Sequence, residues 1–207
     1  MLNLVDRLSN PGHAEFVNRT QETRPDGSGT AIRSVSPADL AALSGFFAGL
    51  SVESRYLRFF APVTPAGGLL HLLSGGPAHV DAMVAVADGV IVGHAMAADR
   101  PGNPCGTQMT DVGVVVADAW QRRGVGAALM RALVLRAQAR GVTSLAMDVL
   151  PANRRVLTMI MSHWPDVAVG YSPDSLDIRI PLPRYQPRRP QPWPAREQVR
   201  PHLTLAG

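Results

Sequence analysis

The sequence predicts one α/β (α+β) domain in which a mixed sheet of six or seven strands is flanked by about four helices. Two apolar runs flank Asp88-Gly89, a dipeptide that favours a tight hairpin because both central residues of such a turn need positive φ. A valine-rich run at 108–117, a helical pattern at 124–140 closed by Gly141, and a strand-like run at 143–150 predict a crossover between parallel strands. The chain has 207 residues and is 46% hydrophobic, which is sufficient for one core.

The remaining elements follow in chain order. A short strand at 31–35 precedes an amphipathic helix at 36–50, on which Leu40, Leu43, Phe47 and Leu50 share a face. A second helix at 51–60 is expected to pack through its aromatic residues Tyr56, Phe59 and Phe60, with Arg55 and Arg58 outside that packed set, and a Pro/Gly-rich connection follows it. After the crossover we expect a helix at about 154–164 and one or two strands within 167–182.

The two ends of the chain differ from the middle. Residues 1–29 are polar and end in RPDGSG, so we expect a flexible N-terminal arm. Residues 183–207 form a tail rich in proline and arginine, in which repeated prolines forbid a regular helix or a central strand. The folded domain is therefore predicted at 30–182.

The charged residues point to anionic partners without identifying them. All 20 basic side chains are arginine, the formal net charge is +4 and the pI is about 10.2. Arginine binds phosphate and carboxylate in a fork geometry, and the tail RYQPRRPQPWPAR has the arginine and aromatic content for nucleic acid, although a solvated tail is the preferred interpretation.

The apolar runs, the single cysteine and the histidines bear on cellular location and metal binding. No apolar run approaches the roughly 20 residues that span a bilayer, and the N-terminus has no signal-peptide core, so we expect a cytoplasmic protein without a membrane partner. The single cysteine, Cys105, cannot form an intramolecular disulfide. The histidines lack the spacing of a zinc site, and no metal is predicted.

The segment WQRRGVGAAL at 120–129 places a glycine turn between a strand and a helix. The first turn of a helix presents unpaired amides and the positive end of the helix dipole, which together form an anion site. Gly124 and Gly126 allow a sharp bend and close approach of a phosphate, and Arg122 and Arg123 add charge at the rim. Alone, such glycines indicate only a tight turn. A P-loop is excluded because the chain has no lysine, and the dinucleotide fingerprint needs a third glycine where Leu129 stands.

The run VVVADAWQRRGVGAALM resembles the Q/R-x-x-G-x-G/A diphosphate loop of the GNAT superfamily of acyl-CoA-dependent N-acyltransferases. The resemblance implies a GNAT-like sheet over about residues 30–182 and acetyl-CoA as cosubstrate. It implies that the pantetheine arm pairs with Val114, Val115 and Val116. It assigns the diphosphate to Gln121, Arg122, Arg123, Gly124, Val125, Gly126 and Ala127. Asn153 matches a family asparagine that contacts the cofactor, while a helix cap is its ordinary role.

The expected chemistry follows from the same resemblance. LSVESRYLRFF is similar to a helix near the acceptor side in a bacterial branch that includes protein-lysine acetyltransferases, and Asp111 matches that branch's general-base glutamate, one methylene shorter. A strand-end aspartate exposed to solvent is the alternative for Asp111. The family's tyrosine acid is absent, because Ile160 stands at its position, so solvent would protonate the departing thiolate.

The resemblance implies transfer of an acetyl group from acetyl-CoA to a primary amine by direct attack in a ternary complex. The acceptor is expected to be a protein lysine or a small-molecule amine. The missing tyrosine and the shortened carboxylate motivate an alternative, a noncatalytic acyl-CoA-binding sensor. The sequence leaves open whether the protein forms a homodimer.

Overall fold

The fold is one eight-stranded mixed sheet with helices on both faces. The computed structural model describes residues 22–23, 30–76, 80–99 and 108–182, and the strand order is β1-β2-β3-β4-β5-β6-β8-β7. The strands are β1 Glu22–Thr23, β2 Thr30–Ser34, β3 Val80–Ala87, β4 Val90–Asp99, β5 Met109–Val116, β6 Ser144–Val149, β7 Ala168–Tyr171 and β8 Leu176–Pro181. The α-helices are α1 Leu40–Gly49, α2 Val52–Phe59, α3 Gly67–Leu73, α4 Val125–Ala139 and α5 Arg154–His163.

The mixed sheet, the hairpin and the crossover are confirmed. Asp88 and Gly89 have φ of 49° and 77° and connect β3 to its antiparallel partner β4. β5 pairs in parallel with β6 after the crossover through α4, whereas the other neighbouring pairs are antiparallel. β1 lies in the segment expected as an arm and pairs with β2. The rest of 1–29, Cys105 and the tail 183–207 lie outside the described residues.

Three details of the helices correct the sequence-based expectation. The Pro/Gly-rich connection after α2 contains a further helix, α3. The helix predicted at 36–50 begins with a 3-10 turn at Pro37–Asp39, and Leu40, expected on its buried face, is 45% exposed while Phe46 is buried. On α2, Tyr56 is exposed, whereas Arg58 is half-buried.

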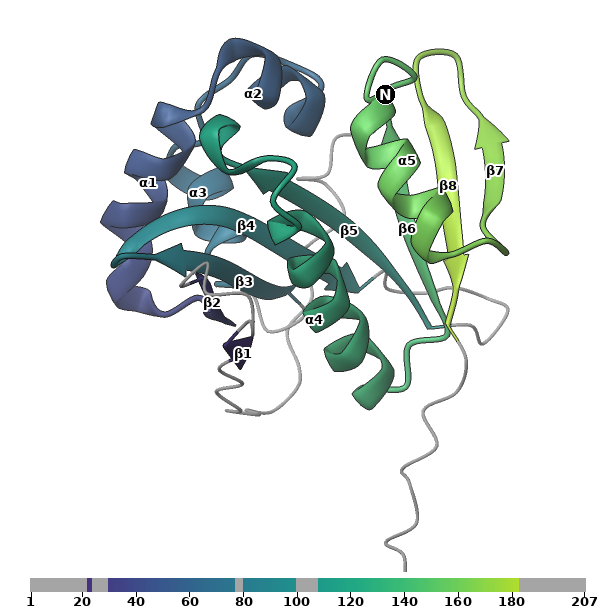
Figure 1. Cartoon of the computed structure of the whole chain (residues 1–207), viewed down its shortest axis with the longest axis horizontal. Coiled ribbons are helices and arrows are strands. Elements are labelled where there is room, and N and C mark those ends of the chain that lie inside the picture. Colours follow the sequence, from purple (N-terminus) through teal and green to yellow (C-terminus); the bar gives the residue numbers. More distant parts are fainter. Residues whose placement is uncertain (1–21, 24–29, 77–79, 100–107, 183–207) are drawn as a thin grey trace, which may run out of the picture.

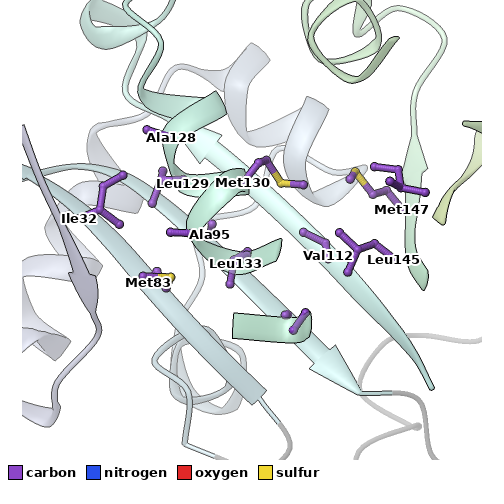
Figure 2. Packing of buried hydrophobic residues seen from close by; sticks show 14 of the residues in the cluster. Ile32, Met83, Ala95, Val112, Ala128, Leu129, Met130, Leu133, Leu145 and Met147 are labelled. Atoms are coloured by element: carbon purple, nitrogen blue, oxygen red, sulfur yellow. The ribbon is translucent and has the colours of Figure 1, made fainter. Parts of the chain in front are cut away.

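The sheet separates the core into two layers, and helices cover each of them (Figure 1). α4 and α5 cover one face, where Leu129 and Leu133 of α4 and Ile160 of α5 pack on the sheet (Figure 2 shows the part around α4). α1 and α3 cover the other face through Leu43, Phe47 and Leu73, among others. Within the described ranges, no helix is long and apolar enough to cross a membrane.

The parallel strands β5 and β6 separate along their length. Only Met109, Thr110 and Asp111 of β5 pair with β6, opposite Ser144, Leu145 and Ala146. Beyond Asp111 the two strands diverge, and Figure 1 shows the resulting wedge. Residues 112–116 of β5 remain paired with β4 on one side and have no β6 partner on the other. On that side, β5 therefore has an edge at which no strand is paired with residues 112–116.

His94 is a polar residue within the layer that α1 and α3 cover. It is fully buried, its ring packs edge-on against Phe47, and its Nε2–H donates to the Leu73 carbonyl at 2.7 Å. Nδ1 has no hydrogen-bond partner. Burial, together with the positive charge of Arg58, lowers the pKa of His94 to about 3, so the ring is neutral at physiological pH.

We predict that His94 makes the protein less stable as the pH falls from 7 to 5. Unfolded His94 gains a proton below about pH 6.5, whereas folded His94 stays neutral to about pH 3, so the unfolded state binds more protons. The slope from this group approaches about 1.4 kcal/mol of unfolding free energy per pH unit. In His94→Gln, whose amide can still donate to Leu73, denaturant unfolding should show a shallower slope. His71→Gln, on the exposed side of α3, is the control; equal slopes in wild type and His94→Gln would contradict the prediction.

Candidate functional site

A pocket of about 400 Å³ lies between α2, the second half of β5, the β5–α4 loop and α5. It therefore borders the wedge in which β5 has no β6 partner. Nine of the twelve residues expected at the site line it: Val114, Val115, Val116, Gln121, Arg122, Gly124, Gly126, Ala127 and Asn153. Residues far apart in the sequence thus meet at one end of the sheet.

The other three predicted residues lie outside the pocket lining. Val125 is only 5% exposed and its side chain belongs to the core under α4. The guanidinium of Arg123 lies over the Trp120 ring, with its Cζ 4.9 Å from the ring centroid. Asp111 is half-buried and occupies the last position at which β5 pairs with β6. It is therefore at the apex of the wedge rather than on the wall of the pocket.

The β5–α4 loop makes a sharp turn into α4. Arg122 and Gly124 are both left-handed, with φ of 62° and 80°, and Gly124 caps the helix. Val125, Gly126 and Ala127 form the first helical turn, so their N–H groups have no helical carbonyl four residues earlier. The positive end of the α4 dipole is therefore directed at a pocket that Gly126 and Ala127 line.

Gly126 has room for a side chain. A Cβ at this position would meet only Val116 Cγ2 at 3.6 Å and Met159 Sδ at 3.8 Å, which are ordinary van der Waals distances. Its backbone is helical and does not need glycine. Packing within the protein therefore does not explain the glycine, whereas close approach of a ligand to the N-terminus of α4 does.

Gln121 joins three walls of the pocket. Its Nε2 donates to the Val116 carbonyl and to Ser54 Oγ of α2, both at 3.1 Å, and its Oε1 accepts from Arg155 Nη1 of α5 at 2.6 Å. These bonds hold α2 and α5 against the end of β5.

Asp118 fastens the start of α2 to the same loop. Its carboxylate accepts from the backbone N–H and hydroxyl of Ser51, at 3.0 and 2.8 Å, and from Ser54 Oγ at 2.8 Å. Partial burial opposes ionisation of Asp118, but these hydrogen bonds outweigh it and leave the pKa below its usual value. The carboxylate is thus charged at neutral pH and serves as an anchor for α2.

Asn153 caps α5, which was the ordinary role expected for it. Its Oδ1 accepts from the backbone N–H of Val156 at 3.3 Å, and the residue also lines the pocket. Ile160, at the position of the missing tyrosine, is 1% exposed and packs in the core. On α5 the pocket is lined instead by Val156, Met159 and His163, together with Arg155 and Thr158.

Sequence reasoning missed the pocket residues on α2 and α5. Ser54, Leu57 and Arg58 of α2 have i, i+3, i+4 spacing, and Val156, Met159 and His163 of α5 have i, i+3, i+7 spacing. Such spacing places each set on one helix face. This spacing is visible in the sequence, but the hydrophobic residues predicted other helix faces as the inward ones.

Positive charge dominates the pocket. Arg58, Arg122 and Arg155 line it, and no Asp or Glu does so among the described residues. Together with the helix dipole, these cations favour an anionic ligand.

Comparison with known proteins agrees with this geometry. Residues 54–160, more than half of the chain, match the model of the acetyltransferase (GNAT) family. Among solved structures, the GNAT domain of PAT from S. lividans superposes with a TM-score of 0.70 at 23% identity, covering 79% of this chain and 97% of that one.

Two further structures share the fold. A ribosomal-protein-alanine N-acetyltransferase from Brucella melitensis gives a TM-score of 0.58 at 20% identity, with 73% of this chain and 99% of that chain covered. A putative acetyltransferase from Salmonella typhimurium, crystallised with its cofactor acetyl-CoA, gives 0.58 at 18% identity, with 79% and 100% covered. The glycine turn into α4, the wedge and the matched family model lead to one conclusion: this chain belongs to the GNAT family of acetyltransferases.

Proposed function

We propose that the protein transfers an acetyl group from acetyl-CoA to a primary amine, of a protein lysine or of a small molecule, by direct attack in a ternary complex. Family membership supports acetyl transfer in general. The observation that carries the proposal is the first turn of α4, whose free amides border a pocket lined by arginines but by none of the described carboxylates. A CoA diphosphate is the anion that fits this turn.

The pocket residues match the parts of acetyl-CoA in order. The diphosphate is assigned to Gln121–Ala127, with Val125 contributing its amide and Arg123 charge at the rim. The pantetheine arm, which carries amide groups, is assigned to the unpaired edge of β5 at Val114–Val116, where an extended chain can add to the sheet. Asn153 closes the pocket from the start of α5.

Bound acetyl-CoA would supply a thioester, and the protein would supply geometry and a base. An amine such as lysine has a pKa near 10.4 and must lose a proton before attack. Asp111, at the apex of the wedge, is the proposed base, directly or through one water. The ammonium form of the acceptor gives one proton to Asp111 and becomes a neutral amine. The nitrogen then forms a bond to the acyl carbon, the carbon–sulfur bond breaks, and the second nitrogen-bound proton passes to solvent. Solvent protonates the thiolate, because Ile160 is buried and apolar.

The burial of Ile160 also favours the second candidate, an acyl-CoA-binding sensor without turnover. Calorimetry with acetyl-CoA tests the binding site, and thiol release in the presence of amines and lysine peptides tests the chemistry. Binding with turnover supports the enzyme, binding without turnover supports the sensor, and no binding of any CoA thioester by folded protein rejects both.

We predict that Gly126→Ala weakens acetyl-CoA binding at least tenfold without destabilising the fold. The new methyl group has room within the protein but faces the proposed diphosphate, and alanine favours a helix by up to about 1 kcal/mol. Gly45→Ala on α1 is the matched control, because nothing lies within 4 Å of its added Cβ. Calorimetry and thermal unfolding check the pair; unchanged affinity in Gly126→Ala would exclude the proposed diphosphate position.

We predict that Asp111→Asn lowers kcat at neutral pH by about 10²–10⁴-fold, the usual contribution of a general base, with little change in acetyl-CoA affinity. Asp174→Asn, in an exposed bend, is the control. A kcat within twofold of wild type would show that another group or water removes the proton.

A further inference from the structure

Arg58 is a half-buried cation that has no counter-ion among the residues that the structure describes. It projects from α2, lines the pocket and stacks on Phe59, with its Cζ 5.0 Å from the ring centroid. Its Nε–H is buried and has no partner, and no hydrogen bond or ion pair engages the guanidinium within the described ranges. Its helix neighbour Arg55 also has a buried Nε without a partner, but its Nη1 donates to the carbonyls of Ala48 and Leu50.

The surroundings of Arg58 make this arrangement costly. Removal from water lowers the pKa of its guanidinium to about 10, and the side chain still remains charged at neutral pH. The neighbouring His94 ring is held neutral. Buried charges in proteins are normally paired, because an isolated one loses its hydration without compensation. A half-buried guanidinium with an unpartnered Nε–H at the wall of a pocket therefore indicates that its anion comes with a ligand.

The guanidinium of Arg58 lies beside Gly113 of β5. A Cβ at Gly113 would overlap Nη2 and Cζ of Arg58, so the guanidinium occupies the space of the absent side chain. Side chains alternate along a strand, which places position 113 on the same sheet face as Asp111 and next to the pocket residue Val114. Arg58 is thus about 7 Å along the strand from the proposed base. The diphosphate turn lies beyond the other end of Val114–Val116.

We propose that Arg58 binds a carboxylate of the substrate, so that the reacting molecule carries a carboxylate close to the atoms that react. This inference rests on the proposed acetyltransferase function. The fork of the guanidinium matches a carboxylate in a bidentate geometry. The carboxylate belongs to the acceptor, as in an α-amino acid, or to the acyl group, as in succinyl-CoA. The acceptor is favoured because Arg58 lies on a face of the sheet, whereas the cosubstrate is assigned to the edge.

The first experiment compares matched acceptors. L-amino acids and their carboxamides are supplied with acetyl-CoA and thiol release is measured. In parallel, N-acetyl amino acids and their amides are titrated into CoA-loaded protein, which reads binding without turnover. We expect KM for the amino acids to be at least tenfold lower than for their carboxamides. We expect the same difference in Kd between the N-acetyl amino acids and their amides. In Arg58→Gln the preference should disappear while the Kd for acetyl-CoA stays within twofold. Arg131→Gln, exposed on α4, is the control.

Two further variants separate a binding role from a folding role. Arg58→Met keeps the apolar stem and removes the charge. Gly113→Ala keeps the charge but displaces the guanidinium, whose flexible end can move away. Both should lose the preference for carboxylates, and thermal unfolding verifies that each is folded. The second arm of the experiment uses succinyl-CoA. If Arg58→Gln weakens binding of succinyl-CoA at least tenfold and does not weaken binding of acetyl-CoA, the carboxylate belongs to the acyl group.

The outcomes separate this inference from the proposed function. Loss of acetyl-CoA binding in Arg58→Gln would assign the arginine to CoA itself and overturn the inference, as would an equal fall in kcat for acids and amides. Equal binding of carboxylates and amides, with no effect on succinyl-CoA, would overturn it as well while leaving acetyl transfer intact. Failure of the wild-type protein to bind acetyl-CoA would instead reject the proposed function.

Discussion

The separation of β5 and β6 after three residue pairs is the constraint on which the site depends. A parallel pair that continued to Val116 would satisfy the backbone of β5 on both sides and leave nothing for a ligand to join. Instead, the second half of β5 is held by β4 alone, and α4 and α5 cover the same face on either side of the wedge (Figure 1). The two sides of the opening remain joined by one core, because residues of α4, of α5 and of both parts of the sheet belong to the same buried cluster. The helix that leaves β5 then directs its free amides at one end of the opening.

Charge is organised around that opening. The acidic residue of the β5–α4 loop, Asp118, does not line the pocket and anchors Ser51 and Ser54 at the start of α2. The pocket is lined instead by arginines, by uncharged polar residues such as Gln121 and Asn153, by His163 and by apolar groups. The anchoring of α2 also positions Arg58 over Gly113. One short helix, α2, therefore contacts both the loop proposed to receive the diphosphate and the end of the pocket where the proposed chemistry occurs.

On α2, the residues that the hydrophobic pattern predicts as packed differ from those that the structure buries. Hydrophobicity favoured Tyr56, Phe59 and Phe60 as the packed residues, yet Tyr56 is 46% exposed and Arg58 is half-buried. On α5, the hydrophobic Met161 is 51% exposed, whereas His163 lines the pocket. Helix faces that border a ligand site are selected for the ligand as well as for the core, so a hydrophobic stripe is a poor guide there.

Local chemistry in the sequence determined much of this protein. Neighbours within a few residues are enough to specify the Asp88-Gly89 hairpin, the glycine turn at 124, the helix α4 that is closed by Gly141, and the family signature. The tertiary structure decided what depends on distant partners. The divergence of β5 from β6, the burial of Arg58 against Gly113 and the placement of Asp111 at the apex result from packing of segments far apart in the chain. Backbone conformation is a short-range property, whereas burial and pocket shape depend on which surfaces the whole fold brings together.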